Sequence, residues 1–401
     1  MRILFVSEDY FPKTSGVPVV VKYLAEGLSE RGFSVSVLTT LPAECTKREE
    51  VVNGVLVFRY NIYRDIFQGI HGEKEDFRRF VTDNSFDAIV VECGQAITTD
   101  CLTPILPKIK SPLLLHAHGL SGLLLKPFTK KTDLYHTVGN TYSWLYMQWY
   151  YCQSFKKALS YYKASISLTD CDSGYDYLKQ HVKKNFVLGN AADDMFFDAE
   201  QNSLSKDLDL QTEGKPFLVS IANYTVVKNQ LQMLEQFYRS ESSKQYALVM
   251  IGSQENDYLK NLRIRYKELE KQCGHRTVTF LTGIDRRALP AILDKAKLYL
   301  VSSTYEEYSI SIIEAMARQV PFISTNVGNA RMLPGGVTLN RIDDMAEEID
   351  RLLGDESLRL KYASAGKSYA HSHCRISNAV ENMAKILEEV HVQNSNLTAS
   401  V

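Results

Sequence analysis

The chain has 401 residues, 45% of them hydrophobic and 23% charged, which is an ordinary composition for a globular protein of about two domains. Its formal net charge of -1 argues against a protein-wide field that would attract nucleic acid or acidic membranes. The seven scattered cysteines contain no C-x-x-C pair, which argues against a disulfide framework or a structural zinc site and favours reduced thiols in the cytoplasm.

The first half of the sequence alternates strand and helix patterns. Residues 3–6 form an apolar run that is too short for a signal peptide and is typical of a buried parallel strand. Apolar residues then recur at helical spacing over 17–28, and residues 33–39 alternate as a second strand, so a right-handed βαβ unit is expected. Further strands are predicted at 55–58, 88–91 and 113–115, and a helix over 135–162. No stretch approaches 18 apolar residues, so no membrane span is expected.

The second half repeats this alternation after a polar, weakly periodic stretch at 198–215, which is typical of a linker. Strands are predicted at 217–221, 247–251, 278–281, 298–301 and 322–324, with helices near 230–241, 258–272, 288–296 and 311–318. The sequence therefore predicts two α/β domains with doubly wound parallel sheets, at 1–198 and 199–375. A final helix at 376–393 is expected to pack back on the first domain.

Ligands of such sheets bind beyond the carboxyl ends of the strands. One such loop, 302–310, leads into a helix whose free amides at Ser309 and Ile310 would attract phosphate. Glu314 on that helix could accept hydrogen bonds from both ribose hydroxyls, and Glu306 would lie near a sugar beyond the phosphates. Isolated glutamates are more often solvated charges, but the apolar residues 315–317 place Glu314 beside a buried surface, where an unpaired charge is costly.

Two further loops carry a lysine and a glycine at the same strand ends. Lys228, in the loop that begins near Asn223, could neutralise part of a diphosphate with a bond worth roughly 1.5–3 kcal/mol, although alone it is typical of a surface lysine. Gly16 would let backbone approach a ligand closely, and an ordinary turn glycine is the alternative. The lack of a G-x-G-x-x-G pattern argues against a dinucleotide cofactor.

Two histidines, His116 and His118, follow the strand at 113–115, and alternation would place them on the same side. They could bind a metal ion, but the sequence shows no third ligand. A hydrogen bond from His118 to a sugar or phosphate is the favoured functional interpretation, with core histidines as the alternative.

These loops together resemble those of retaining GT-B glycosyltransferases of glycosyltransferase family 4. Residues 306–317, with the sequence EEYSISIIEAMA, are similar to the Glu-x7-Glu motif of that family. Residues 1–40, 190–193, 280–284 and 325–328 also resemble family segments, so the likeness spans nearly the whole chain. It implies a GT-B fold whose two Rossmann-like domains face a cleft, the first binding an acceptor and the second a nucleotide sugar.

The resemblance also implies roles for single residues. The catalytic residues would be His118, Lys228 and Glu306, with no metal and no cofactor required. The donor-binding residues would be Gly16, Asn223, Lys228, Gly283, Ile284, Glu306, Ser309, Ile310 and Glu314. Asn223 departs from the pattern, because the family usually has an arginine there, and one diphosphate cation is therefore missing.

The expected function is a retaining hexosyltransferase that moves a sugar from a nucleoside diphosphate to a hydroxyl of a glycan or lipid-linked acceptor. Bacterial surface polysaccharide or glycolipid assembly is the expected setting, in the cytoplasm or at the inner face of the membrane, with no nucleic-acid partner. An inactive GT-B partner subunit, which Asn223 favours, and a sugar-nucleotide epimerase or phosphorylase are the alternatives. The aromatic residues of 142–151 fit a core-facing helix, or contact with a membrane-surface acceptor.

Overall fold

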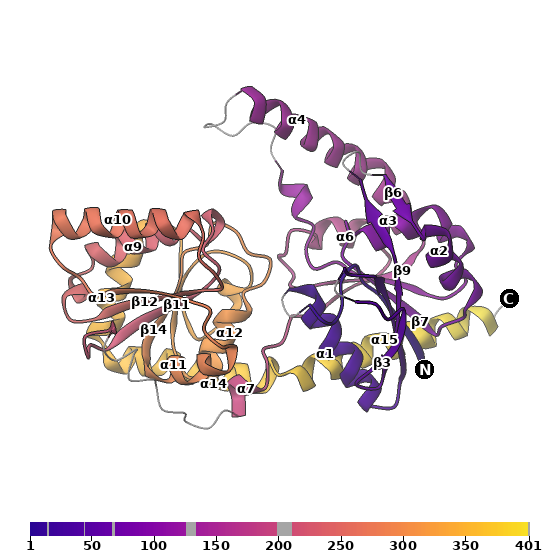
Figure 1. Cartoon of the computed structure of the whole chain (residues 1–401). Helices are drawn as coiled ribbons and strands as arrows, with labels where there is room; N and C mark the ends of the chain where they lie inside the picture. The colour runs from indigo at the N-terminus through magenta and orange to yellow at the C-terminus, as the bar shows by residue number, and fades with distance from the viewer. Residues whose placement is uncertain (14–15, 44, 66–68, 126–133, 199–210, 400–401) are drawn as a thin grey trace. The chain divides into compact units, whose positions relative to one another are not determined.

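The computed structural model describes residues 1–13, 16–43, 45–65, 69–125, 134–198 and 211–399, without the side chains of 134–140 and 393–399. The chain forms two compact units, Met1–Asn190 with Ala379–Val401, and Ala191–Asn378 (Figure 1). The second unit begins before the predicted boundary at 198, because Phe196 and Phe197 of α7 (Met195–Asp198) pack in its hydrophobic core. Most of the predicted linker, 199–210, lies outside the described residues.

The first unit contains an eight-stranded sheet in the order β10-β9-β8-β7-β1-β2-β4-β3. All neighbouring strands pair in parallel except β3 and β4, so the predicted parallel sheet carries one antiparallel edge strand. The strands of this sheet are β1 (Arg2–Val6), β2 (Ser34–Thr40), β3 (Glu49–Val52), β4 (Val55–Tyr60), β7 (Ala88–Glu92), β8 (Leu113–His116), β9 (Tyr162–Ser167) and β10 (Asn185–Val187). A separate antiparallel pair consists of β5 (Ile62–Arg64) and β6 (Ile70–Gly72).

The helices of the first unit differ from prediction in one region. The helix expected over 135–162 is interrupted by a π-helical segment, Tyr150–Phe155, whose aromatic side chains are buried in the core. Strand β9 then begins at Tyr162, where the sequence shows no continuous apolar run. The helices are α1 (Val17–Glu30), α2 (Lys74–Asp83), α3 (Ile97–Leu102), α4 (Leu134–Trp149), α5 (Lys156–Leu159) and α6 (Tyr175–His181).

Helix α4 has two different faces where its side chains are described. Met147 packs against the core, whereas Tyr142, Leu145 and Trp149 are exposed. The interpretation of this stretch as a core-facing helix therefore holds for only one of its sides. None of the described helices is long and apolar enough to cross a membrane.

The last helix, α15 (Ile376–Ala399), packs on α1. From Ala379 onward it belongs to the first unit, and Lys184 near β10 forms an ion pair with Glu389 on it. A Cβ atom added to Gly27 of α1 would lie only 2.5 Å from Cγ2 of Val380. Close approach of the two helices therefore requires glycine at position 27.

Gly27→Ala is expected to destabilise the first unit by about 1–3 kcal/mol, because the added methyl group overlaps Val380 in a packed interface. Gly354→Ala is the matched control, since a Cβ atom there meets nothing within 4 Å. Thermal midpoints of the two variants check this, and equal midpoints would contradict the packing of α15 on α1.

The second unit contains a six-stranded sheet, all parallel, in the order β13-β12-β11-β14-β15-β16. Its strands are β11 (Phe217–Ile221), β12 (Ala247–Gly252), β13 (Val278–Thr282), β14 (Ala296–Val301), β15 (Phe322–Thr325) and β16 (Gly336–Leu339). Its longer helices are α9 (Gln230–Arg239), α10 (Asp257–Cys273), α11 (Leu289–Lys295), α12 (Ile310–Ala317), α13 (Met345–Gly354) and α14 (Glu356–His373).

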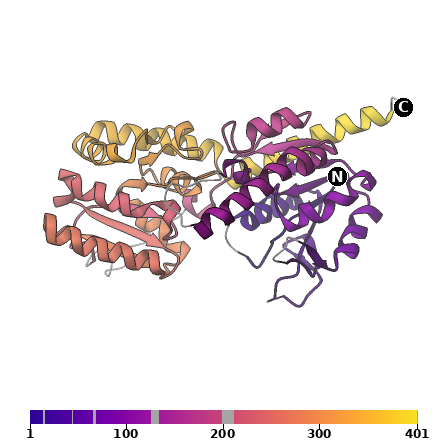
Figure 2. The same ribbon diagram turned by 90° about the horizontal axis from the view of Figure 1, so that it is seen from above.

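Strand alternation divides the core of the second unit into two layers. Phe217 and Val219 of β11 pack with residues of α11 and α12, whereas Leu218 between them packs with residues of α9, α10 and α13. Helices therefore cover both faces of this sheet, as the turned view also shows (Figure 2). The prediction of two doubly wound parallel sheets is confirmed, apart from the edge strand β3.

Each sheet has one point where the strand order reverses. In the first unit β1 lies between β2 and β7, and in the second β11 lies between β12 and β14. Successive strands run outward in opposite directions from these points, and the loops diverge there to leave room for a ligand. Gly16, Lys228 and Glu306 lie in loops at these points, and the other candidate residues lie in neighbouring loops or at the start of α12 (Ile310–Ala317).

Candidate active site

In the second unit, the loops that follow β11 and β14 are joined by hydrogen bonds. The amide of Thr304 donates to the carbonyl of Val227 at 2.8 Å, and the hydroxyl of Ser302 donates to the carbonyl of Lys228 at 2.8 Å. The ammonium of Lys228 forms an ion pair with the carboxylate of Glu306, so the structure brings these two predicted catalytic residues together.

Glu306 is held from two further directions. The hydroxyl of Ser303 donates to its carboxylate at 2.6 Å. The loop after β15 packs against it through Gly328, where φ is 51° and a Cβ atom would lie 3.2 Å from that of Glu306. A side chain at 328 would be strained by the backbone and crowded by Glu306, so glycine is required there.

The start of α12 differs from the expectation in one respect. The amide of Ser309, predicted to bind phosphate, donates to the side-chain oxygen of Asn329 at 2.8 Å. The side chain of Asn329 therefore occupies the amide of Ser309. The sequence does not predict this contact, because Asn329 lies in the loop after a different strand. Within the described part of the chain the amide of Ile310 has no such cap, so the donors available to a phosphate begin at Ile310.

Glu314 is buried, as its apolar neighbours indicated, with 3% of its surface exposed. Burial raises the pKa of its carboxyl, and an ion pair with the guanidinium of Arg286 opposes that rise. Arg286 lies in the loop after β13, over the ring of Phe196 at 5.2 Å. Arg286 was not among the predicted site residues, and its only signal in the sequence is a position beyond the carboxyl end of a strand.

The remaining donor-binding candidates of the second unit lie at the same sheet edge. Gly283 has a φ of 68° and open space where a Cβ atom would stand, and Ile284 packs against the core beneath it. Asn223 is exposed, and its carbonyl accepts a hydrogen bond from the side chain of Gln230 at 2.9 Å. These positions follow β13 and β11 respectively.

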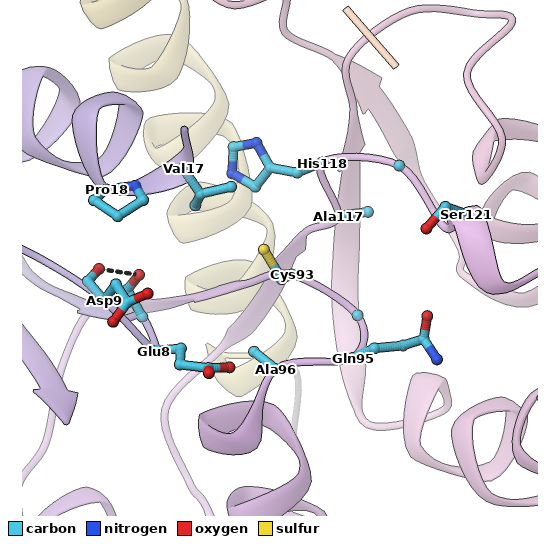
Figure 3. Close-up of a pocket in the computed structure, with 13 residues that line it drawn as sticks. Glu8, Asp9, Val17, Pro18, Cys93, Gln95, Ala96, Ala117, His118 and Ser121 are labelled. Atoms are coloured by element: carbon cyan, nitrogen blue, oxygen red, sulfur yellow. Dashed lines mark hydrogen bonds between the residues drawn. The ribbon is translucent and has the colours of Figure 1, made fainter. Parts of the chain in front are cut away.

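A pocket of about 450 Å³ lies at the reversal point of the first sheet (Figure 3). The loops after β1, β7 and β8 form it together with the start of α1. Gly16 precedes α1 with a φ of 71° and open space at its Cβ position. The pocket lining is Ser7, Glu8, Asp9, Val17, Pro18, Cys93, Gly94, Gln95, Ala96, Ala117, His118, Gly119 and Ser121.

A buried cluster of Glu92, His116 and His118 lies beside this pocket. One carboxylate oxygen of Glu92 is 2.6 Å from Nε2 of His118 and 3.1 Å from Nδ1 of His116. The two imidazole centroids are 3.9 Å apart. His118 reaches its place through a left-handed backbone conformation, with φ 54°, so strand alternation alone does not account for the pairing.

Glu92 is the third candidate metal ligand, which the sequence did not reveal. The three side chains offer ligand atoms within 4.8 Å of one another, and two histidines with a carboxylate are a set that zinc accepts. Glu92 and His118 form a hydrogen bond, whereas both ring nitrogens of His116 and the other carboxylate oxygen of Glu92 are buried without a hydrogen-bond partner in the described part of the chain. Although burial opposes ionisation, His116 and His118 hold the pKa of Glu92 at about 2, and burial lowers the pKa of His118.

Comparison with known proteins gives a sequence family for part of the second unit and a fold for the whole chain. Residues 206–369 match the family model "Glycosyl transferases group 1". A segment of 133 residues is 28% identical to an alpha-D-kanosaminyltransferase of Streptomyces kanamyceticus, covering 31% of this chain and 34% of that enzyme. The matched segment thus spans about a third of that relative's length.

Solved structures of the same fold cover nearly the whole chain. A sucrose-phosphate synthase of Thermosynechococcus elongatus superposes with a TM-score of 0.73 at 16% identity, over 98% of this chain and 99% of that one. The Anabaena protein HepE, in complex with UDP and glucose, gives 0.67 at 16% identity, over 97% and 100%. The chain therefore has the GT-B fold, and its second unit carries the sequence pattern of the group 1 glycosyl transferases.

Proposed function

We propose that this protein is a retaining glycosyltransferase that moves a hexose from a nucleoside diphosphate to an acceptor hydroxyl. The observation that carries the proposal is the Lys228–Glu306 ion pair, which joins the loops after β11 and β14 beside the start of α12. It lies inside the segment that matches the group 1 family. A cation, a carboxylate and a helix start are the groups that a diphosphate with an attached sugar requires.

The nucleotide would bind in the second unit. Glu314 would accept the ribose hydroxyls, with Arg286 moving aside or sharing the carboxylate. Gly283 and Ile284 would lie near the base. UDP in the complex of the structurally similar HepE is compatible with this kind of donor.

Catalysis would depend mainly on the leaving group. In the transition state the sugar resembles an oxocarbenium ion and negative charge grows on the departing diphosphate. Lys228 and the amide of Ile310 would stabilise that charge without reorganisation, which is the most effective form of electrostatic catalysis. Glu306, released from Lys228 when the diphosphate binds, would contact the donor sugar, and His118 the transferred sugar.

The acceptor would enter the pocket of the first unit. A glycan or lipid-linked acceptor is proposed, in surface polysaccharide or glycolipid assembly, in the cytoplasm or at the inner membrane face. The exposed Tyr142, Leu145 and Trp149 on α4 support contact with a membrane surface, since tyrosine and tryptophan suit interfaces.

Removing metal ions is expected to leave turnover unchanged, because protein cations and helix amides carry the diphosphate charge. Turnover is measured before and after prolonged chelation, alongside elemental analysis of the purified protein. A fall in turnover that zinc or magnesium restores would contradict this proposal.

The proposed function is tested by a nucleotide-sugar screen. Ligands that bind the folded protein raise its thermal midpoint, so a panel of UDP and GDP sugars identifies the donor. Transfer to acceptors then follows, with the anomeric configuration of the product read by NMR. An inverted product would contradict retention.

A second candidate, an inactive partner subunit, is favoured by one observation: Asn223 stands where the family pattern has an arginine. For an inactive subunit, calorimetry would show that the donor binds. An assay without acceptor would then show no hydrolysis of the donor, not even the slow hydrolysis expected of an active transferase. Donor hydrolysis by the purified chain would exclude this candidate.

A further inference from the structure

The pocket of the first unit is lined by two carboxylates and, among the described residues, by no lysine or arginine. Glu8 and Asp9 both follow the end of β1 (Figure 3). Asp9 forms an ion pair with Lys13 at 2.6 Å, and Lys13 itself does not belong to the lining. The carboxylate of Glu8 has no such cation beside it in the described part of the chain, so a ligand in the pocket would meet its negative charge.

Glu8 has one carboxylate oxygen in use and one available. Its Oε2 accepts a hydrogen bond from the amide of Ile97 at 3.0 Å, which holds the side chain at the start of α3. Its Oε1 has no hydrogen-bond partner within the described residues. The side chain is exposed, and exposed carboxylates are ionised at neutral pH, so this oxygen accepts hydrogen bonds and cannot donate one.

The neighbouring groups offer few hydrogens to a ligand. The hydroxyl of Ser7 donates to the carbonyl of Asp9 at 2.7 Å, which leaves its oxygen to accept. Helix α1 begins at the pocket, but Pro18 has no amide hydrogen and the amide of Val19 donates to the carbonyl of Gly16 at 3.2 Å. The start of α1 therefore attracts an anion less than an ordinary helix N-terminus does.

We propose that Glu8 determines the class of acceptor. The sugar that enters this pocket presents hydroxyl or ammonium groups to Oε1 of Glu8, and sugars that carry a phosphate or a carboxylate are excluded. A phosphate monoester has a charge of about -1.5 to -2 at neutral pH and would lie against a like charge. The inference rests on the proposed function, in which this pocket holds the acceptor, and it adds the residue and the chemistry that select it.

Binding of matched sugars tests this class without turnover. Methyl glucoside, galactoside and mannoside are each compared with their 6-phosphate and their uronic acid, which keep the ring and change one substituent. Ligand-observed NMR titrations of the full-length protein are expected to show binding in at least one series, with the anions at least about 10-fold weaker than the neutral sugar. Equal binding of an anion, or no binding by any neutral sugar, would overturn the proposal.

Amino sugars test the sign of the charge. Members of the binding series with an amine at C2 or C6 are expected to bind at least as tightly as the neutral sugar, because an ammonium group donates hydrogen bonds and carries the opposite charge. Weaker binding of both amines would overturn the proposal.

Glu8→Gln tests the residue itself. Glutamine keeps an oxygen for the amide of Ile97 and can place an NH₂ where Oε1 stands. The preference for the neutral sugar over its 6-phosphate is expected to narrow by about 10-fold. Glu30→Gln is the matched control, since Glu30 is an exposed glutamate at the end of α1 outside the pocket lining. A wild-type preference in Glu8→Gln would overturn the proposal.

Transfer is measured in parallel, with the donor from the nucleotide-sugar screen and the same sugars as acceptors. If the neutral sugar binds with the expected preference and no product forms, the result counts against the proposed function alone. If product forms as readily on a 6-phosphate or a uronic acid as on the neutral sugar, the role of Glu8 is wrong and the proposed function stands.

Discussion

Lys228→Ala is expected to lower kcat by about 10²–10³, the loss seen when one donor to a developing anion is removed. Lys228 is the cation that the structure places in the loop after β11, and Asn223 in the same loop carries no charge. The diphosphate would leave without its main cationic partner. Steady-state kinetics with the donor from the screen measure the effect.

The control for this prediction is Lys244→Ala. Like Lys228, Lys244 forms an ion pair with a glutamate, Glu241. This pair lies on an exposed 3₁₀ segment after α9, where an ion pair contributes little to stability. Its removal is expected to leave kcat unchanged. Undiminished turnover in Lys228→Ala, with an unchanged thermal midpoint, would reject the assignment of the donor site.

Glu314→Gln is expected to weaken nucleotide binding by about 10- to 150-fold, because hydrogen bonds to a charged group contribute roughly 1.5–3 kcal/mol. The substitution removes the charge that pairs with Arg286 and that the ribose hydroxyls are proposed to contact, while keeping the side chain's volume in a buried position. Calorimetry with UDP and GDP measures the affinity. An unchanged affinity for both nucleotides would contradict the ribose role.

The same carboxylate predicts a pH dependence. Its pKa is raised by burial, so Glu314 takes up a proton at a higher pH than an ordinary glutamate does. Nucleotide affinity in wild type is therefore expected to fall on acidification, and Glu314→Gln is expected to lose this dependence. Arg286→Ala leaves the buried carboxylate without its cation and is expected to move the fall to still higher pH.

The sequence predicted those features of the site that are local along the chain. The apolar residues after Glu314 indicated its burial, and the strand ends located the loops of Lys228 and Glu306. The partners it missed come from other loops: Arg286 is 28 residues from Glu314, Asn329 is 20 from Ser309, and Glu92 is 26 from His118. Their pairing depends on strand order, which hydrophobic periodicity does not contain.

The fold, like the site, was predicted only in part from the sequence. Continuous apolar runs identified the central strands of both sheets, because strands buried on both faces have this pattern. Outer strands were missed: β3, at one edge of the first sheet, has the sequence EEVV and one exposed face, and β9, next to the other edge, mixes lysine and serine with its apolar residues. The compact second unit begins at Ala191 and not at the predicted residue 199, because the phenylalanines of α7, a helix too short to show periodicity, belong to the second core.

The second unit is a continuous insertion between two parts of the first, and this affects the order of folding during translation. Ala191–Asn378 emerges from the ribosome before the α15 segment that packs on α1. A nascent chain can thus complete the inserted sheet while α1 still exposes the surface around Gly27 to solvent. Chains arrested after Asn378 would present this apolar face to chaperones, and the first unit would become protease-resistant only after residues such as Val380, Met383 and Leu387 have docked.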